Sequence, residues 1–176
     1  MTVPAWHEEA ITRKHDRATF DCGDTDLNVF LMRYARRSHD QGGAKTFLAI
    51  GDDTRAILGF YSLAPASLAW HHAPEIAQRG LARHEVPGFR LARIAIDRTS
   101  QDRGLGGQLL LTAGRRCLMA AAVVGGTVLI IDAKSDTAAA WYVSYGAMPL
   151  LDAERTLVLP LAALESLLRE AGKLTP

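Results

Sequence analysis

Apolar side chains recur at helical spacing in four stretches of the chain. The first stretch begins at Gly23-Asp24-Thr25-Asp26, whose side-chain oxygens suit the free N–H groups of a first helical turn, and Gln41-Gly42-Gly43 ends it. Its apolar positions are Leu27, Phe30, Leu31, Tyr34 and Ala35. The other predicted helices are Leu105 to Val124, Asp136 to Tyr145 behind a Ser135 cap and before Gly146, and a last helix opened by Pro160 with leucines at 161, 164, 167 and 168.

Alternating and β-branched stretches between these helices predict strands. Lys45 to Ile50 and Ala56 to Ala64 flank a turn at residues 51–54, so we expect a hairpin. The other predicted strands are Arg90 to Asp97, Thr127 to Asp132 and Arg155 to Leu159. The stretch from Pro65 to Gly88 is expected to be irregular, with one short helix around Pro74 to Gly80. This order of elements predicts an α/β or α+β fold with one central sheet.

Composition narrows the class of protein further. The 176 residues, without repeat or linker, predict a single domain spanning residues 1–176. The longest apolar run, Cys117 to Ile131, is short of the ~20 residues that span a bilayer, and Glu8 and Glu9 interrupt any N-terminal signal. We therefore expect a cytoplasmic protein with no membrane contact. The two cysteines, Cys22 and Cys117, lack the spacing of a zinc site, so no metal is expected.

The arginines are unevenly spread although the net charge is only +1. Residues 79–103 hold six arginines against three acids, and residues 33–45 hold three arginines and Lys45 against Asp40. The guanidinium group presents a planar set of donors that matches phosphate oxygens, so both clusters are candidate anion-binding surfaces. The alternative is that they are solvated faces whose arginines pair with scattered acids.

A glycine-rich turn joins the predicted strand that ends at Asp97 to the longest predicted helix. Glycines at 104, 106 and 107 let the backbone approach a ligand, and the first N–H groups of the helix have no internal acceptor. Together these features predict a cradle for a pyrophosphate. A Walker loop would need Gly-Lys-Ser/Thr where Gly106-Gly107-Gln108 stands, and a dinucleotide fingerprint would need glycine at Leu109. The alternative is a tight connection that binds no ligand.

This segment resembles the GNAT superfamily of acetyl-coenzyme A-dependent N-acetyltransferases. The family signature Gln/Arg-x-x-Gly-x-Gly/Ala matches Gln101 to Gly106. Ala138-Ala139-Ala140-Trp141-Tyr142-x-x-x-Gly146 is similar to the family's helix that supplies a tyrosine to the coenzyme thiol, although Trp141 replaces the usual phenylalanine and Ala147 the usual aromatic residue. The resemblance implies a GNAT fold, with a central mixed, mainly antiparallel sheet flanked by helices, and acetyl-CoA as cosubstrate.

The resemblance also implies roles for individual residues. The backbone of Ile94, Ala95 and Ile96 is expected to pair with the pantetheine amides of the coenzyme as an added strand would. The turn expected to hold the pyrophosphate consists of Gln101, Asp102, Arg103, Gly104, Leu105, Gly106 and Gly107, with Arg103 as a further clamp. Tyr142 is the expected general acid. Asp97 is expected to cap the loop, and Trp141 and Tyr145 to pack in the core.

A narrower resemblance, covering about residues 15 to 160, is to the TacT-like toxins of bacterial toxin–antitoxin pairs. It rests on Phe20 to Leu27 with the basic helix through Arg37, Leu91 to Asp97, and shorter matches at residues 45–47, 59–63 and 155–157. It implies acetylation of the α-amino group of aminoacyl-tRNA, which blocks translation. The residues expected to contact tRNA phosphates are Arg36, Arg37, Arg90 and Arg93.

The same resemblance implies a small ribbon-helix-helix antitoxin that joins the enzyme to operator DNA, and a homodimer. A free α-amino group titrates near pH ~8, and an adjacent ester lowers that pKa, so this substrate needs little help from a general base. One alternative is a GNAT enzyme that acetylates a small amine or a protein N-terminus. Another is a degenerate GNAT fold that serves as an interaction or RNA-binding module.

Overall fold

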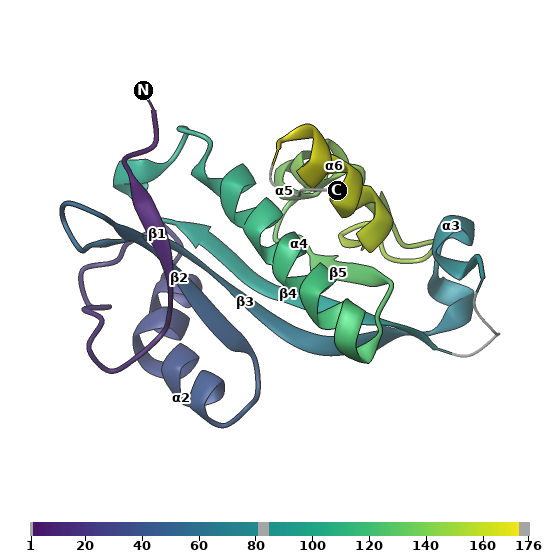
Figure 1. Cartoon of the computed structure of the whole chain (residues 1–176), viewed down its shortest axis with the longest axis horizontal. Helices are drawn as coiled ribbons and strands as arrows, with labels where there is room; N and C mark the ends of the chain where they lie inside the picture. Colours follow the sequence, from purple (N-terminus) through teal and green to yellow (C-terminus); the bar gives the residue numbers. More distant parts are fainter. Residues whose placement is uncertain (1, 81–84, 173–176) are drawn as a thin grey trace. The chain divides into compact units, whose positions relative to one another are not determined.

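The computed structural model describes residues 2–80 and 85–172 (Figure 1). Contacts within the chain define two compact units. Unit 1 comprises Met1–Ala64 and Ala92–Leu110, and unit 2 comprises Pro65–Leu91 and Leu111–Pro176. The expectation of a single domain over residues 1–176 stays a prediction.

A mixed sheet is the central feature of the described chain. Its strands are β1 (Trp6–Ala10), β2 (Lys45–Gly51), β3 (Ile57–Leu68), β4 (Val86–Ile96), β5 (Val128–Asp132), β6 (Met148–Pro149) and β7 (Thr156–Pro160), in the order β1-β2-β3-β4-β5-β7-β6. The pairs β1–β2, β2–β3, β5–β7 and β6–β7 are antiparallel, whereas β4 and β5 are parallel. This confirms the predicted hairpin and the mixed, mainly antiparallel sheet.

The helices agree with the sequence pattern in most places. They are α1 (Thr25–Val29), the π-helical turn η1 (Phe30–Tyr34), α2 (Ala35–Asp40), the 3₁₀ turn η2 (Trp70–His72), α3 (Glu75–Gln78), the 3₁₀ turn η3 (Arg98–Ser100), α4 (Leu105–Val124), α5 (Asp136–Val143) and α6 (Leu161–Glu170). Helix α4 has the predicted bounds, Ser135 caps α5, and Pro160 caps α6. Among the described residues, no helix is long and apolar enough to cross a membrane.

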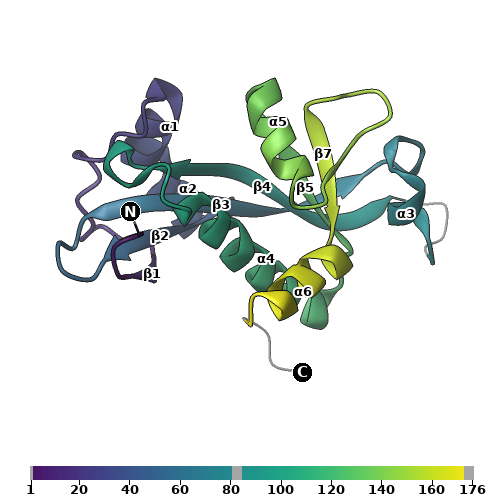
Figure 2. The same ribbon diagram turned by 90° about the horizontal axis from the view of Figure 1, so that it is seen from above.

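In unit 1, helices α1 and α2 lie on one face of the strands and the beginning of α4 lies on the other (Figures 1 and 2). The core beneath α1 and η1 is aromatic: the ring of Phe60 is 5.5 Å from Phe20 and 6.2 Å from Phe30, measured between centroids. Leu31 and Leu48 are fully buried beside these rings. This core fixes the position of the first helical segment against the sheet.

The first predicted helix is interrupted by a π-helical turn. Asp24 caps its N-terminus as predicted, accepting a hydrogen bond from the Leu27 N–H at 3.1 Å. In η1, however, the N–H of Ala35 donates to the carbonyl oxygen of Phe30, an i to i+5 bond. The wider turn brings Ala35 rather than Tyr34 to the buried face, and Tyr34 is 59% exposed. The prediction that Tyr34 belongs to the apolar stripe is therefore wrong.

Three further differences concern strands. Strand β1 was not predicted, because its charged residues mask any alternation; the Tyr61 hydroxyl donates to Glu8 at 2.6 Å and ties this edge strand to the sheet. The two-residue strand β6 was also missed. Strands β3 and β4 extend into the stretch expected to be irregular. The predicted short helix there is confirmed as α3, while residues 81–84 lie outside the described residues.

In unit 2, helices α4 and α6 lie on one side of β5 and β7, and α5 lies on the other (Figure 2). Residues 128–131 of β5 are at most 1% exposed, as expected for a strand covered on both faces. Helices α4 and α6 pack closely at Gly114, where an added Cβ would lie 2.8 Å from the Leu164 side chain. Of the four leucines in the predicted stripe of α6, Leu161, Leu164 and Leu168 are buried, and Leu167 is half-buried.

Candidate functional site

The turn between β4 and α4 is anchored by two side chains. Asp97 accepts hydrogen bonds from the N–H of Thr99 at 3.0 Å and from the N–H of Asp21 at 3.0 Å, so it caps the loop as predicted. The Gln101 Nε2 donates to the carbonyl oxygens of Ile96 and Cys22, each at 2.9 Å. The Gln101 side chain therefore holds the turn in place, which leaves the backbone of the following residues as the surface available to a ligand.

The backbone of this turn is unusual. Asp102 has a φ of +60° and Gly104 a φ of +89°. Residues other than glycine rarely adopt these positive backbone angles. A Cβ built on Gly104 meets no described atom within 4 Å, so the backbone there faces open space. Leu105, 1% exposed, fixes the start of α4 in the core. The first helical N–H groups are thus presented beside an open, glycine-lined turn, and Arg103 lies half-buried within it.

Strand β4 contains residues of both units. In unit 2 it pairs with β5 from Gly88–Val128 to Leu91–Ile131. The predicted pantetheine-binding residues, 94–96, form the end of β4 in unit 1, directly before the turn. Their extended backbone is of the kind to which a strand-like ligand can add.

Tyr142 lies on α5 in unit 2. The Ser135 hydroxyl accepts a hydrogen bond from the Ala138 N–H at 3.1 Å and begins this helix. Tyr142 is 6% exposed, and burial raises its pKa to about 12. The Trp141 ring packs edge-on against Tyr142 and Tyr145, with centroid distances of 4.9 and 5.1 Å. Trp141 and Tyr145 are half-buried rather than in the core. Tyr142 is thus a protonated phenol held by its neighbours.

The four arginines expected to contact phosphate belong to different units of the chain, one to unit 2 and three to unit 1. Arg90 belongs to unit 2, where it pairs with Asp132, the last residue of β5. In unit 1, Arg36 pairs with Asp40 at 2.8 Å, while Arg37 is exposed. The Arg93 guanidinium carbon lies 3.9 Å from the centroid of the Phe30 ring, a cation–π contact that brings strand β4 to the first helical segment.

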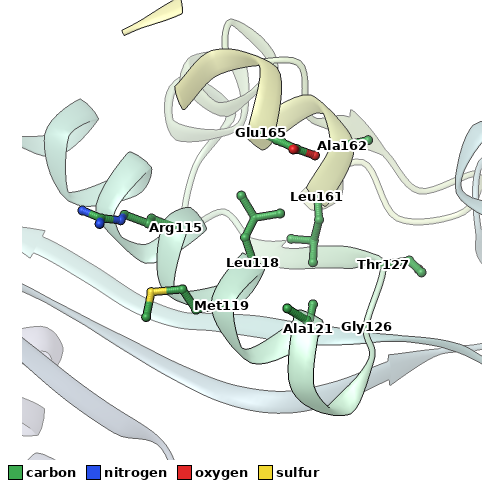
Figure 3. Close-up of a pocket in the computed structure, with 10 residues that line it drawn as sticks. Arg115, Leu118, Met119, Ala121, Gly126, Thr127, Leu161, Ala162 and Glu165 are labelled. Carbon is green, nitrogen blue, oxygen red and sulfur yellow. The ribbon is translucent and has the colours of Figure 1, made fainter. Parts of the chain in front are cut away.

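Unit 2 also contains a pocket of about 840 Å³ between α4 and α6 (Figure 3). Leu118, Met119 and Leu161 line it, with Arg115 and Glu165 among its polar residues. None of the residues predicted from the sequence to bind coenzyme or tRNA lies in its wall. Among the described residues, no group of three or more His, Cys, Asp or Glu side chains could hold a metal ion.

Two toxins are similar to this chain in sequence. A tRNA-acetylating toxin of Mycobacterium tuberculosis is 36% identical over 135 residues, which are 77% of this chain and 80% of the toxin. A protein of Sinorhizobium fredii described as a probable toxin TacT is 27% identical over 163 residues, 88% of this chain and 90% of its own length. No protein-family model matches the chain.

Solved structures show the same fold. AtaT complexed with acetyl-methionyl-tRNAfMet is 28% identical, with a TM-score of 0.86 and coverage of 93% of this chain and 99% of AtaT. A tyrosine-to-phenylalanine mutant of AtaT, bound to the C-terminus of the antitoxin AtaR and to acetyl-CoA, has a TM-score of 0.77 at 28% identity. The match covers 92% of this chain and 97% of that one. The KacTA–DNA complex has a TM-score of 0.79 at 28% identity, and the match covers 94% of this chain and 99% of that one.

Proposed function

The chain belongs to the tRNA-acetylating toxins, acetyl-CoA-dependent N-acetyltransferases of the GNAT type, and we propose that it acetylates the α-amino group of aminoacyl-tRNA and thereby blocks translation. The observation that carries this proposal is the 36% identity to a tRNA-acetylating toxin over 77% of the chain. The structural likeness to AtaT, solved with an acetylated aminoacyl-tRNA, supports it. Neither comparison favours a small amine or a protein N-terminus as the acceptor.

The turn and the end of β4 supply groups that suit the coenzyme. The extended backbone of Ile94, Ala95 and Ile96 would pair with the pantetheine amides. The N–H groups at the start of α4 would bind the diphosphate, and the absence of a side chain at Gly104 gives them room. Arg103 would add a charged donor. When bound, acetyl-CoA supplies the acetyl thioester.

Tyr142 is the residue that we propose to act on the departing sulfur. With a pKa of about 12 its hydroxyl keeps its proton at neutral pH and can donate a hydrogen bond. Full transfer of that proton to a thiolate, whose thiol titrates near ~8.5, would be uphill by roughly 5 kcal/mol. Tyr142 therefore stabilises the developing negative charge by hydrogen bonding and does not have to give up its proton. As the C–N bond forms and the C–S bond breaks, the attacking nitrogen loses one proton to solvent and the departing coenzyme thiolate can take one from solvent, so the step balances without a protein acid or base.

No carboxylate is required as a base in this mechanism. The α-amino group of an aminoacyl ester is largely neutral at cellular pH. Asp97, the carboxylate at the end of β4, is fully engaged in capping the turn. The protein's task is to position the amine and to stabilise the leaving group.

Arg37 and Arg93 are the best placed of the four predicted phosphate contacts, since Arg36 and Arg90 already have carboxylate partners. We expect tRNA binding to weaken steeply with salt, and Arg37→Gln to make the slope of log K against log [salt] shallower by about 0.7–0.9, the value of one phosphate contact. Fluorescence anisotropy with labelled tRNA between 50 and 300 mM salt (about a sixfold range) would measure both slopes. Arg169→Gln, which breaks only the ion pair with Glu165 on α6, is the control. A salt-independent affinity would contradict the phosphate contacts.

Four further features are proposed for this chain. The antitoxin complexes of AtaT and KacT support a protein antitoxin, which we infer to be of the ribbon-helix-helix class that binds operator DNA. We also infer a homodimer, and a single acetyltransferase domain over residues 1–176. Because aminoacyl-tRNA is used in translation, the activity belongs in the cytoplasm.

Transfer of labelled acetyl from acetyl-CoA to charged tRNA tests the proposal directly. The wild-type chain should label aminoacyl-tRNA, and mild deacylation should release the label as an N-acetyl amino acid. Polyamines, peptides and uncharged tRNA offered under the same conditions should stay unlabelled. Labelling of a peptide or polyamine in preference to charged tRNA would reject the proposed acceptor.

A further inference from the structure

The π-helical turn η1 presents an aromatic ring to solvent. Phe30, Leu31 and Ala35 are at most 9% exposed, whereas Tyr34 is 59% exposed. In a continuous α-helix, Tyr34 would follow Phe30 by four residues and share its buried face. The i to i+5 bond between Ala35 and Phe30 shifts the register by one residue and turns Tyr34 outward.

Several cations lie on or contact the turn that exposes Tyr34. Arg33 and Arg37 are exposed, one helical turn apart on either side of Tyr34 in the sequence, and no described carboxylate pairs with either. Arg93 reaches the same turn from β4 through its contact with Phe30. Arg17 reaches it from the preceding loop, where its Nη1 donates to the Leu31 carbonyl oxygen at 3.5 Å. Tyr34 therefore lies on a turn that carries Arg33, is followed by Arg37, and is contacted by two further cations from other segments of unit 1.

An exposed aromatic ring with flanking arginines suits an unpaired nucleotide. Every base has a face that can stack on an aromatic ring, and arginines beside it can bind the adjoining phosphates. A protein partner would favour a broader apolar surface, but of the residues next to Tyr34 only Met32 is an exposed large apolar side chain. The combination of one ring and several cations therefore favours single-stranded RNA.

We propose that Tyr34 stacks on an unpaired base at the acceptor end of the substrate tRNA, with Arg33 and Arg37 on the neighbouring phosphates. This inference rests on the proposed function, because it assumes that aminoacyl-tRNA is the substrate. The aminoacylated end of tRNA is single-stranded, which frees its bases for stacking. Tyr34 is thus a substrate-positioning residue on η1.

Replacing Tyr34 tests the stacking. Tyr34→Ala should weaken binding of tRNA by about 5- to 150-fold, the usual effect of removing one stacked base contact, while Tyr34→Phe keeps the ring and stays within about 2-fold of wild type. Met32→Ala, an exposed neighbour in η1 without an aromatic ring, is the matched control and should change little. In steady-state transfer, Tyr34→Ala should raise KM for charged tRNA and leave kcat nearly unchanged.

A shortened RNA identifies the base that is contacted. An acceptor-stem hairpin with its single-stranded 3′ nucleotides should bind wild type more tightly than the same hairpin without them, and Tyr34→Ala should remove most of that difference. If Tyr34→Ala binds tRNA within 2-fold of wild type, or loses equal affinity for both hairpins, the inference is wrong. A variant that keeps tRNA affinity but loses antitoxin binding would overturn it too, by assigning Tyr34 to a protein contact.

The failures of the two proposals can be distinguished. If wild type does not transfer acetyl to charged tRNA, the proposed function fails. If wild type does transfer it, and Tyr34→Ala has an unchanged KM for charged tRNA, only the stacking fails. Acetyl-CoA titration of Tyr34→Ala should match wild type in either case, because the coenzyme turn is a separate segment of unit 1.

Discussion

Tyr142→Phe is expected to lower kcat by ~10²–10³, the usual effect of removing one hydrogen bond to developing negative charge, while leaving acetyl-CoA affinity within about 2-fold of wild type. The substitution removes the hydroxyl that stabilises the leaving sulfur but keeps the ring, which is 6% exposed and packed against Trp141. Single-turnover transfer to charged tRNA and calorimetric titration with acetyl-CoA would measure the two effects separately.

Tyr145→Phe is the matched control, because Tyr145 contacts the same Trp141 ring but lies in the turn after α5. It should retain near-normal turnover. Since the pKa of Tyr142 is raised to about 12, wild-type kcat should rise toward a plateau as the substrate amine loses its proton, with no fall below pH 10. Near-normal turnover of Tyr142→Phe would remove this residue from the mechanism.

Gly104→Leu is expected to weaken acetyl-CoA binding by at least about tenfold. The side chain would enter the open space beside the first N–H groups of α4, where the diphosphate is proposed to bind. It would also force a leucine into a left-handed conformation, which costs about 1–2 kcal/mol of stability. Calorimetric titration with acetyl-CoA and thermal unfolding would record the two effects.

Gly42→Leu separates ligand contact from backbone strain. Gly42 has a φ of +76°, close to the +89° of Gly104, and an added Cβ there likewise meets no described atom within 4 Å. The two variants should therefore lose similar stability, but Gly42→Leu should bind acetyl-CoA like wild type. Equal coenzyme affinity in both variants would show that the turn at Gly104 does not hold the diphosphate.

Much of the candidate site could be predicted from the sequence, because it depends on residues that act on their immediate neighbours. The bounds of α4, the caps at Asp24 and Ser135, and the turn before Leu105 follow from residues that act on their immediate neighbours. The alternation that predicted a strand from Arg90 to Asp97 is likewise local, and β4 covers residues 90–96 of that stretch. The two GNAT-like motifs lie in these segments, which is why the family could be anticipated.

Other features depend on contacts between distant residues. The Gln101 side chain donates to Cys22, 79 positions earlier, and Arg90 pairs with Asp132, 42 positions later. The spacing of residues along the chain does not reveal either partner. From the sequence we therefore predicted that Gln101 contacts the coenzyme and that Arg90 contacts a phosphate. The structure gives Gln101 a role in holding the turn and gives Arg90 a carboxylate partner.

The sequence by itself determined which segments are helical, where the glycine-rich turn lies, and that Tyr142 belongs to the helix after Ser135. It could do so because capping, periodicity and glycine conformations act within a few residues. Only the tertiary structure decided that Tyr34 faces solvent, that β1 pairs with β2, and that residues 88–91 of β4 pair in parallel with β5. Helix register and strand partners depend on packing free energy, summed over residues far apart in the chain, and this can override local preference.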